Sequence, residues 1–177
     1  MAKVHSVCET TNLRAVHYAE RIWDAVSTED IDNGTLGYLD GVKTEGGVIY
    51  NFVKGTKEGA AVVLAHNPEW TEDTSCRLNQ RKDKFFIESG VPFRAFTLKE
   101  GDEFALSTEG FVGTPDVDKY VSINAEGRLA VADAPVEGAV MVGKIMRKRQ
   151  IGSTLVTGIR DYGYSRMMYV VKVESLA

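Results

Sequence analysis

The side chains best suited to catalysis or metal binding are few and scattered along the chain. His5, His17 and His66 never stand four residues apart, the spacing at which two histidines on one helical face hold a metal ion. Cys8 and Cys76 form no Cys-x-x-Cys pair, so a zinc site lacks ligands at a suitable spacing. We expect histidines that serve packing or lie at the surface, and two unpaired thiols.

A second candidate for chemistry is the acidic group Glu100, Asp102 and Glu103. Several carboxylates together suit a hard cation, but these three lack the fixed ligand ladder of a calcium loop. The sequence also contains no phosphate-binding glycine loop and no Gly-x-Ser-x-Gly motif. We therefore predict a protein that is not an enzyme and that has no cofactor and no metal site.

Length and composition predict one soluble globular unit. The chain has 177 residues, of which 44% are hydrophobic and 26% charged, within the range of ordinary globular proteins. A net charge of −4 argues against a general nucleic-acid binder, which normally carries a basic excess. No apolar run follows Lys3, and no apolar segment approaches the roughly 18–20 residues that span a membrane. We expect synthesis in a cytoplasm and no membrane partner.

The strongest local structural signal lies between Pro92 and Gly113. Two short apolar runs, at 93–98 and 104–106, flank the segment Lys-Glu-Gly-Asp at 99–102. Bulky residues in both runs and a glycine beside an acid between them are typical of a β-hairpin. We predict a central hairpin here.

Short strands and close turns are predicted along most of the remaining chain. Seven glycines between Gly34 and Gly59 favour strands and turns over a helix. In the last run, residues 167–173, apolar side chains alternate with a period of two, as in a half-buried strand. The other expected strands span 36–39, 48–53, 60–65, 119–123, 128–132, 140–151 and 154–160. This pattern predicts a mainly β fold, an antiparallel barrel or sandwich of short strands with at most short helices.

Residues 1–34 permit two interpretations. Leu13, Val16, Ile22, Trp23 and Val26 have spacings compatible with one helical face, which favours an amphipathic helix. The β-branched residues before them favour an extended N-terminal arm. We predict an arm or amphipathic segment over 1–34 and a β-rich domain over 35–177.

Charge is distributed unevenly over the C-terminal half. Between residues 100 and 137 there are nine acids and two bases, and between 144 and 172 there are seven bases and one acid. Three explanations stay open. The charges pair across strands of one sheet, an acidic flank meets the basic flank of a neighbouring subunit in a ring, or the basic run 144–149 contacts nucleic acid.

One segment resembles a known family. Residues 85–104 read Phe-Phe-Ile-Glu-Ser-Gly-Val-Pro-Phe-Arg-Ala-Phe-Thr-Leu-Lys-Glu-Gly-Asp-Glu-Phe, preceded by Asp-Asn-Gly-Thr-Leu-Gly at 32–37 and followed by Val-Gly-Lys-Ile at 142–145. This arrangement, from residue 30 to the C-terminus, resembles the head decoration (capsid cement) proteins of tailed bacteriophages. The resemblance implies a β-rich virion protein that assembles on the outside of the capsid, binds several capsid subunits, and often uses a terminal arm.

From the resemblance and the residues together we expect a structural protein on the capsid surface. Its partner is the major capsid protein, it is a homo-oligomer, and it does not bind nucleic acid directly. The alternative is a small β-barrel binding module, or a tail or connector component, without catalytic activity. The expected contacts with the capsid or a neighbouring subunit are Arg14, Arg21, Ile22, Trp23, Lys144, Arg147 and Arg149.

Overall fold

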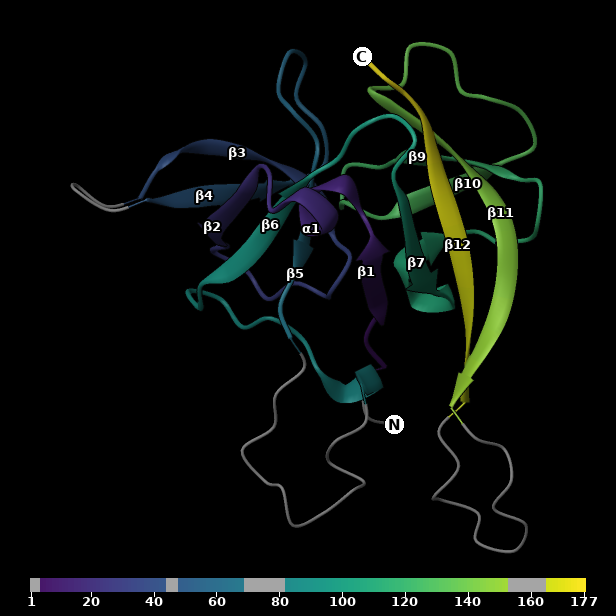
Figure 1. Ribbon diagram of the computed structural model, residues 1–177, viewed down its shortest axis with the longest axis horizontal. Helices are drawn as coiled ribbons and strands as arrows, with labels where there is room; N and C mark the ends of the chain where they lie inside the picture. The colour runs from purple at the N-terminus through teal and green to yellow at the C-terminus, as the bar shows by residue number, and fades with distance from the viewer. Residues whose placement is uncertain (1–3, 44–47, 69–81, 153–164) are drawn as a thin grey trace, which may run out of the picture.

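The computed structural model describes residues 4–43, 48–68, 82–152 and 165–177. The fold is mainly β, as predicted, and consists of a small closed barrel beside an open sheet of seven strands (Figure 1). In chain order the elements are β1 Cys8–Asn12, α1 Arg14–Tyr18, β2 Ile22–Val26, β3 Leu36–Val42, β4 Ile49–Lys54, β5 Val63–His66, η1 Lys82–Lys84, β6 Phe93–Thr97, β7 Glu103–Ser107, η2 Thr108–Gly110, β8 Phe111–Val112, β9 Tyr120–Ile123, β10 Leu129–Ala132, β11 Met141–Gly152 and β12 Ser165–Leu176.

The barrel closes in the order β2-β4-β3-β5-β6, with β2 and β4 parallel and the other pairs antiparallel. Alternate residues of these strands point inward and form one apolar cluster, because side chains on a strand alternate between its two faces. All five strands contribute to this cluster, so it is the interior of the barrel. It comprises the buried residues Ala25, Ile31, Phe52, Val63, Ala65, Ile87, Phe93 and Ala95, with Trp23, Leu39 and Phe85 packed against it.

The open sheet has the order β1-β7-β12-β11-β9-β10-β8. Its longest elements, β11 and β12, form an antiparallel pair with register shifts between Val142 and Gly143 and between Ile145 and Arg147. A larger apolar cluster lies between sheet and barrel and joins them into one folded body. Leu36, Leu64 and Phe96 enter it from the barrel, and Phe104 and Val171 enter it from the sheet.

The predicted central hairpin is wrong. β6 pairs with β2 and β5 in the barrel, whereas β7 pairs with β1 and β12 in the sheet. The turn between them contacts β12 instead of folding β7 back onto β6. The Gly101 N–H donates to the Val173 carbonyl at 2.9 Å, and the Val173 N–H donates to the Asp102 carbonyl at 2.9 Å. Gly101 has φ +87°, a left-handed conformation that glycine adopts without strain.

The expected N-terminal arm is also incorrect, because residues 5–34 belong to the folded body. β1 is an edge strand of the sheet, and β2 pairs with β4 and β6 to close the barrel. Only α1, five residues long, follows the helical alternative, and it ends where Ala19 takes a left-handed φ of 49°. Leu13 and Ala25 are fully buried. Leu13 belongs to the cluster between barrel and sheet, and Ala25 belongs to the barrel interior, so this segment contributes to both apolar clusters.

Most other predicted strands are confirmed with small shifts at their ends. The strand expected at 60–65 begins only at Val63, because the Ala60 N–H bonds back to the Lys57 carbonyl in a turn. β12 alternates as predicted, but both of its faces are buried: Val171 and Val173 face the barrel, while Met168 and Val170 join a small cluster on the other side. The strand predicted at 154–160 lies outside the described residues, as does Cys76.

Candidate contact site at the mouth of the barrel

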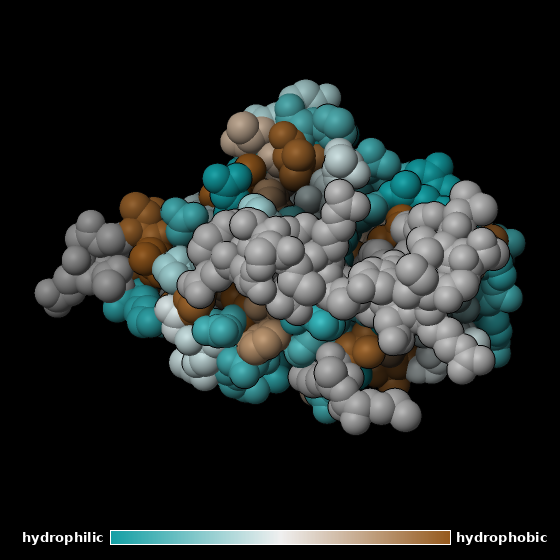
Figure 2. All heavy atoms as spheres, turned by 90° about the horizontal axis from the view of Figure 1, so that it is seen from below, coloured by the Kyte–Doolittle hydropathy of each residue, from teal (hydrophilic) through white to brown (hydrophobic). Residues whose placement is uncertain are grey.

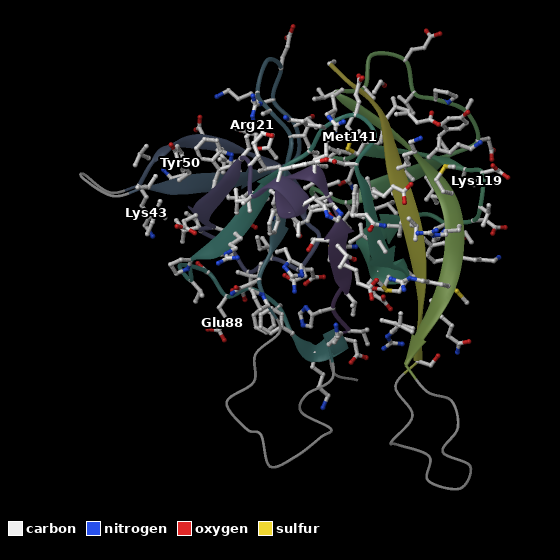
Figure 3. The ribbon with its side chains drawn as sticks, viewed as in Figure 1. Arg21, Lys43, Tyr50, Glu88, Lys119 and Met141 are labelled. Atoms are coloured by element: carbon white, nitrogen blue, oxygen red, sulfur yellow. The ribbon has the colours of Figure 1, made fainter. Side chains whose placement is uncertain are left out.

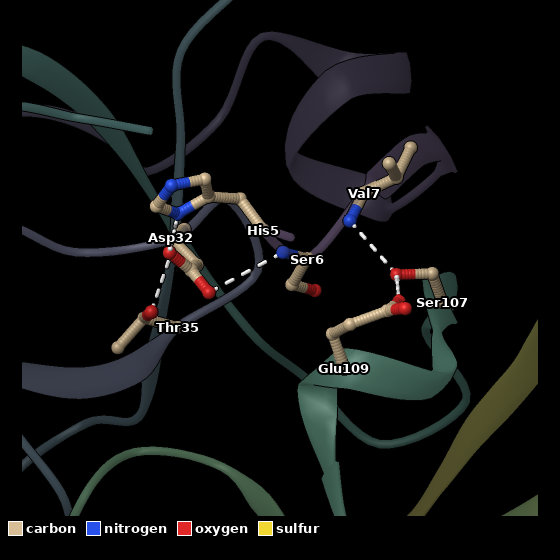
Figure 4. A network of polar contacts seen from close by, with 7 residues as sticks. All are labelled: His5, Ser6, Val7, Asp32, Thr35, Ser107 and Glu109. Carbon is tan, nitrogen blue, oxygen red and sulfur yellow. Dashed lines mark hydrogen bonds and ion pairs between the residues drawn. The ribbon is translucent and has the colours of Figure 1, made fainter. Parts of the chain in front are cut away.

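The histidine and carboxylate groups nearest to a catalytic arrangement serve structural roles. His5 Nδ1 lies 2.7 Å from Asp32 Oδ1 (Figure 4). The His5 ring also stacks on Phe86, with centroids 4.8 Å apart. Ser6 follows directly, but its hydroxyl makes no hydrogen bond in the described structure, so it forms no triad with that pair. Within the described ranges, no group of three or more His, Cys, Asp or Glu side chains is placed to bind a metal ion.

In the acidic turn at 99–102, the Asp102 side chain likewise has a structural role. Asp102 is buried, and its carboxylate accepts the backbone N–H of Lys99 at 2.8 Å and of Arg14 at 2.9 Å. One carboxylate thereby connects the β6–β7 turn to the start of α1.

An apolar hollow of about 450 Å³ lies at one end of the barrel. The opposite end is closed, because Ile31 and Ile87 form an isolated β-bridge there and both side chains are buried. Figure 3 shows the two ends, with Arg21 at the upper end of the barrel and Glu88 at the lower. The hollow is lined by Arg21, Trp23, Leu39, Ala60, Ala61, Val63 and Thr97. Mouths of β-barrels are common binding sites, so this is the candidate contact site.

Trp23 is held in place at this mouth. Its indole N–H donates to the Thr97 hydroxyl at 2.9 Å, across the β2–β6 pair. Tyr50 of the neighbouring β4 meets the Trp23 ring edge-on, with centroids 5.2 Å apart and planes at 77°. The indole is only half-buried. A partly exposed aromatic side chain with a fixed orientation loses little conformational freedom when a partner covers it.

Arg21 is the charged residue among those that line the hollow, and it lies beside an acid. The Glu20 carboxylate lies 3.5 Å from Arg21 Nε and 3.2 Å from Lys99 Nζ, so one anion faces two cations. Arg21 has φ +56°, an uncommon conformation for a residue with a side chain, and its carbonyl accepts the Thr97 N–H at 3.2 Å. The exposed Arg21 guanidinium has further N–H donors, which can pair with an acidic group on a partner that fills the hollow.

A second exposed apolar surface lies on the β3–β4 hairpin. Val42 and Val48 are 52% and 68% exposed. In Figure 2 hydrophobic atoms gather beside the end of this hairpin, at the left of the view. The end of the β3–β4 hairpin projects away from the rest of the barrel (Figure 1), so these exposed valines lie on the projecting end of the hairpin.

The expected contact residues divide between two places. Arg21 and Trp23 lie together at the barrel mouth, and Arg14 is exposed on α1 nearby. Ile22 points to the opposite side of β2 and packs against the cluster between barrel and sheet, so it is a core residue. Lys144, Arg147 and Arg149 lie on β11 in the open sheet.

The basic residues of β11 pair with acids of the same chain. Lys144 Nζ lies 3.0 Å from Asp118, Arg147 lies 3.8 Å from Glu103, and Arg149 pairs with Glu9. The hydrogen bond to Asp118 raises the pKa of the half-buried Lys144 amine above its ordinary value. These pairs lie within one chain and favour the intramolecular explanation of the charge pattern over the two intermolecular ones, although none of them joins β11 to a neighbouring strand.

The sequence did not identify Leu39, Ala60, Ala61, Val63 and Thr97 as parts of one site. These residues meet only because the barrel closes through pairings between distant strands, including the parallel β2–β4 pair. The one available signal was the alternation within each strand, which indicates which residues share a face but not which strands are neighbours.

Comparison of the chain with family models, curated proteins and solved structures finds no match. In the described parts of the chain, no helix has the length and apolar character needed to cross a membrane.

Proposed function

We propose that this chain is a structural virion protein without catalytic activity that binds the outside of an assembled phage capsid and stabilises it. The resemblance of residues 85–104 to head decoration proteins suggests the class. The observation that carries the proposal is the apolar hollow at the barrel mouth, with the half-buried Trp23 held between Thr97 and Tyr50. The partner is the major capsid protein, and the site of action is the virion surface.

The chemistry of the hollow favours a protein contact. Trp and Arg are the side chains most enriched among residues that dominate binding energy at interfaces, and they act best in a pocket that excludes water. Trp23 and Arg21 share such a hollow. An apolar side chain of the capsid would fill the hollow, and an acidic one beside it would pair with Arg21.

Stabilisation follows from mass action. A protein that binds the assembled shell, but not its dissociated subunits, shifts the equilibrium toward the shell by an amount set by its concentration relative to the dissociation constant. The expected homo-oligomer stays a prediction. The pairing of Arg147 and Arg149 within the chain argues against a ring held together by those charges.

Co-sedimentation with purified expanded capsids of the phage that encodes the chain tests this proposal. We expect saturable binding and a higher temperature of capsid disruption. Trp23→Ala should weaken binding at least tenfold, whereas Val112→Ala, at an exposed position on β8 in the open sheet, should bind like the wild type. Absence of binding to capsids and to every other virion component would contradict the proposal.

The same hollow favours a second candidate, a module that binds a small apolar ligand at the barrel mouth. Its volume of about 450 Å³ lies within the range of small-molecule sites. An environment-sensitive apolar dye such as anilinonaphthalene sulfonate provides the test. Stoichiometric dye binding that Trp23→Ala removes, together with no capsid binding, would favour this candidate over the first.

A further inference from the structure

A second, polar cavity lies between the barrel and the open sheet. Its volume is about 140 Å³, and its wall is built from Ser6, residues 30–35 before β3, Lys54 at the end of β4, η2, and the β9–β10 turn at 126–128. None of these residues lines the barrel mouth, so the cavity is separate from the proposed contact site.

The Ser6 hydroxyl is the unusual group in this wall. Ser6 is only 3% exposed, and its Oγ has no hydrogen-bond partner in the described structure. A Cβ on Gly110 would lie 3.0 Å from this oxygen, so the glycine backbone packs closely against the hydroxyl. A buried hydroxyl without a hydrogen-bond partner is unfavourable, because it has lost its bonds to water. Because Ser6 lines the cavity, a bound group inside the cavity would supply the missing partner.

The charged residues that line the cavity favour the binding of a cation. Asp30, Asp32, Glu109 and Glu126 line the cavity, against Lys54 and Arg128. The Lys54 ammonium is already engaged, since its Nζ donates to Glu29 Oε2 at 2.8 Å. A concave site with a surplus of one charge concentrates ions of the opposite sign.

The carboxylates of Glu109 and Asp30 each have one oxygen that makes no hydrogen bond within the described residues. Glu109 Oε2 accepts the Ser107 hydroxyl at 2.6 Å, which leaves Oε1 for another donor (Figure 4). Asp30 Oδ1 accepts the Ser89 N–H at 2.9 Å, which leaves Oδ2. With the Ser6 hydroxyl, these oxygens give three acceptors among the residues that line the cavity.

We propose that this cavity binds a primary alkylammonium group, carried by a free amine or by a lysine side chain. A primary ammonium has three N–H donors and no acceptor, which matches three hydrogen-bond acceptors with a surplus of negative charge. A metal ion is the poorer match, because the described residues place no three carboxylate, thiol or imidazole groups close enough to bind one. The cavity, of about 140 Å³, admits an ammonium and a short alkyl chain.

Titration with n-butylammonium, followed by NMR of the full-length protein, tests the proposal. We expect saturable shifts of the Gly110 and Gly127 amide signals, since both residues line the cavity. Tetramethylammonium carries the same charge without an N–H donor and should bind at least tenfold more weakly. Nα-acetyl-lysine amide, titrated in parallel, distinguishes the two sources: tighter binding than butylammonium indicates a lysine side chain, and weaker binding a free amine.

Two substitutions connect the binding to the proposed groups. Ser6→Ala and Glu109→Gln should each reduce butylammonium affinity at least fivefold, with the circular dichroism spectrum unchanged. Glu58→Gln removes one exposed carboxylate outside the cavity and should leave the affinity unchanged.

The opposite results would overturn the inference. Equal binding of butylammonium and tetramethylammonium, or equal losses in Glu109→Gln and Glu58→Gln, would mean general charge attraction. No shift at Gly110 or Gly127 would mean that the cavity holds only water. Neither result depends on capsid binding, so this inference and the proposed function fail separately.

Discussion

Trp23 donates its indole N–H to the hydroxyl of Thr97 across the β2–β6 pair, at 2.9 Å, and this bond fixes the aromatic side chain at the mouth of the barrel. Both residues line the apolar hollow. The hydrogen bond satisfies the polar edge of an indole whose face stays available to a partner. Orientation of Trp23 is therefore a property of the free protein, present before any partner binds.

Thr97→Val should loosen this arrangement. The substitution keeps the shape of the side chain but removes the acceptor, which lowers the unfolding free energy by about 1 kcal/mol and permits other orientations of Trp23. We expect several-fold weaker capsid binding, measured by co-sedimentation, and a shifted Trp23 fluorescence spectrum in a Trp70→Phe background. Thr97→Ser retains the hydroxyl and serves as the matched control, so equal losses in both variants would show that the hydrogen bond is not responsible.

Asp102→Asn should destabilise the fold. The buried carboxylate accepts two backbone N–H groups, from Lys99 and Arg14. An asparagine offers only one acceptor oxygen and leaves the other N–H facing an amide donor, at a loss of about 1–3 kcal/mol. Urea unfolding measures the difference. The exposed Glu100, one residue before Gly101 in the same turn, supplies the control Glu100→Gln, whose stability should match that of the wild type.

Deletion of residues 1–26 should unfold the protein. The deletion removes β1 and β2, opens the barrel between β4 and β6, and takes Leu13 and Ala25 out of the core. We expect loss of the cooperative thermal transition seen by circular dichroism. Tyr18→Ala, at a side chain 74% exposed in the same segment, should leave that transition unchanged. A truncated chain that still unfolds cooperatively would restore the view of this segment as an arm.

The Lys148–Asp116 pair should make the stability of the fold depend on pH. The hydrogen bond from Lys148, whose Nζ lies 2.9 Å from Asp116 Oδ1, lowers the pKa of the Asp116 carboxyl below its ordinary value. A carboxyl with a lowered pKa in the folded state contributes stability above its unfolded pKa, and this contribution is lost as the pH falls through the folded pKa. Lys148→Met should raise the Asp116 pKa toward the ordinary value, as followed by NMR titration.

The effect should be local. Asp133 owes its lowered pKa first to a hydrogen bond from Lys119, so its titration should be unchanged in Lys148→Met. Both pairs are exposed, and high salt should weaken both shifts. An Asp116 pKa that stays low in the variant would exclude Lys148 as its cause.

Local sequence signals predicted most strands but not their partners. β-Branched runs and glycine turns located β3, β4, β9, β10 and β11 within a few residues. The turn at 99–102 was also found, yet whether β7 folds back on β6 depends on contacts with β12, about seventy residues later in the chain. Such pairings are set by packing between distant segments, which a local pattern does not contain.

The N-terminal segment shows the same limit. Leu13, Val16 and Ile22 have helical spacing, but the left-handed residues Ala19 and Arg21 end α1 and direct the chain into β2. On a strand, neighbours face opposite sides, so Trp23 reaches the barrel mouth while Ile22 enters the core. Of the contact residues predicted from the sequence, Arg21 and Trp23 line the hollow, and their role as contacts stays a prediction. The other residues that line the hollow were not predicted from the sequence.

The central claim is that the mouth of the barrel contacts the capsid, and an electron cryomicroscopy map of capsids decorated with the wild-type chain tests it most directly. The account predicts continuous density between the shell and the hollow at Trp23, with an acidic capsid side chain near Arg21 and the basic residues of β11 turned away. A map in which the barrel mouth faces solvent and β11 meets the shell would contradict it.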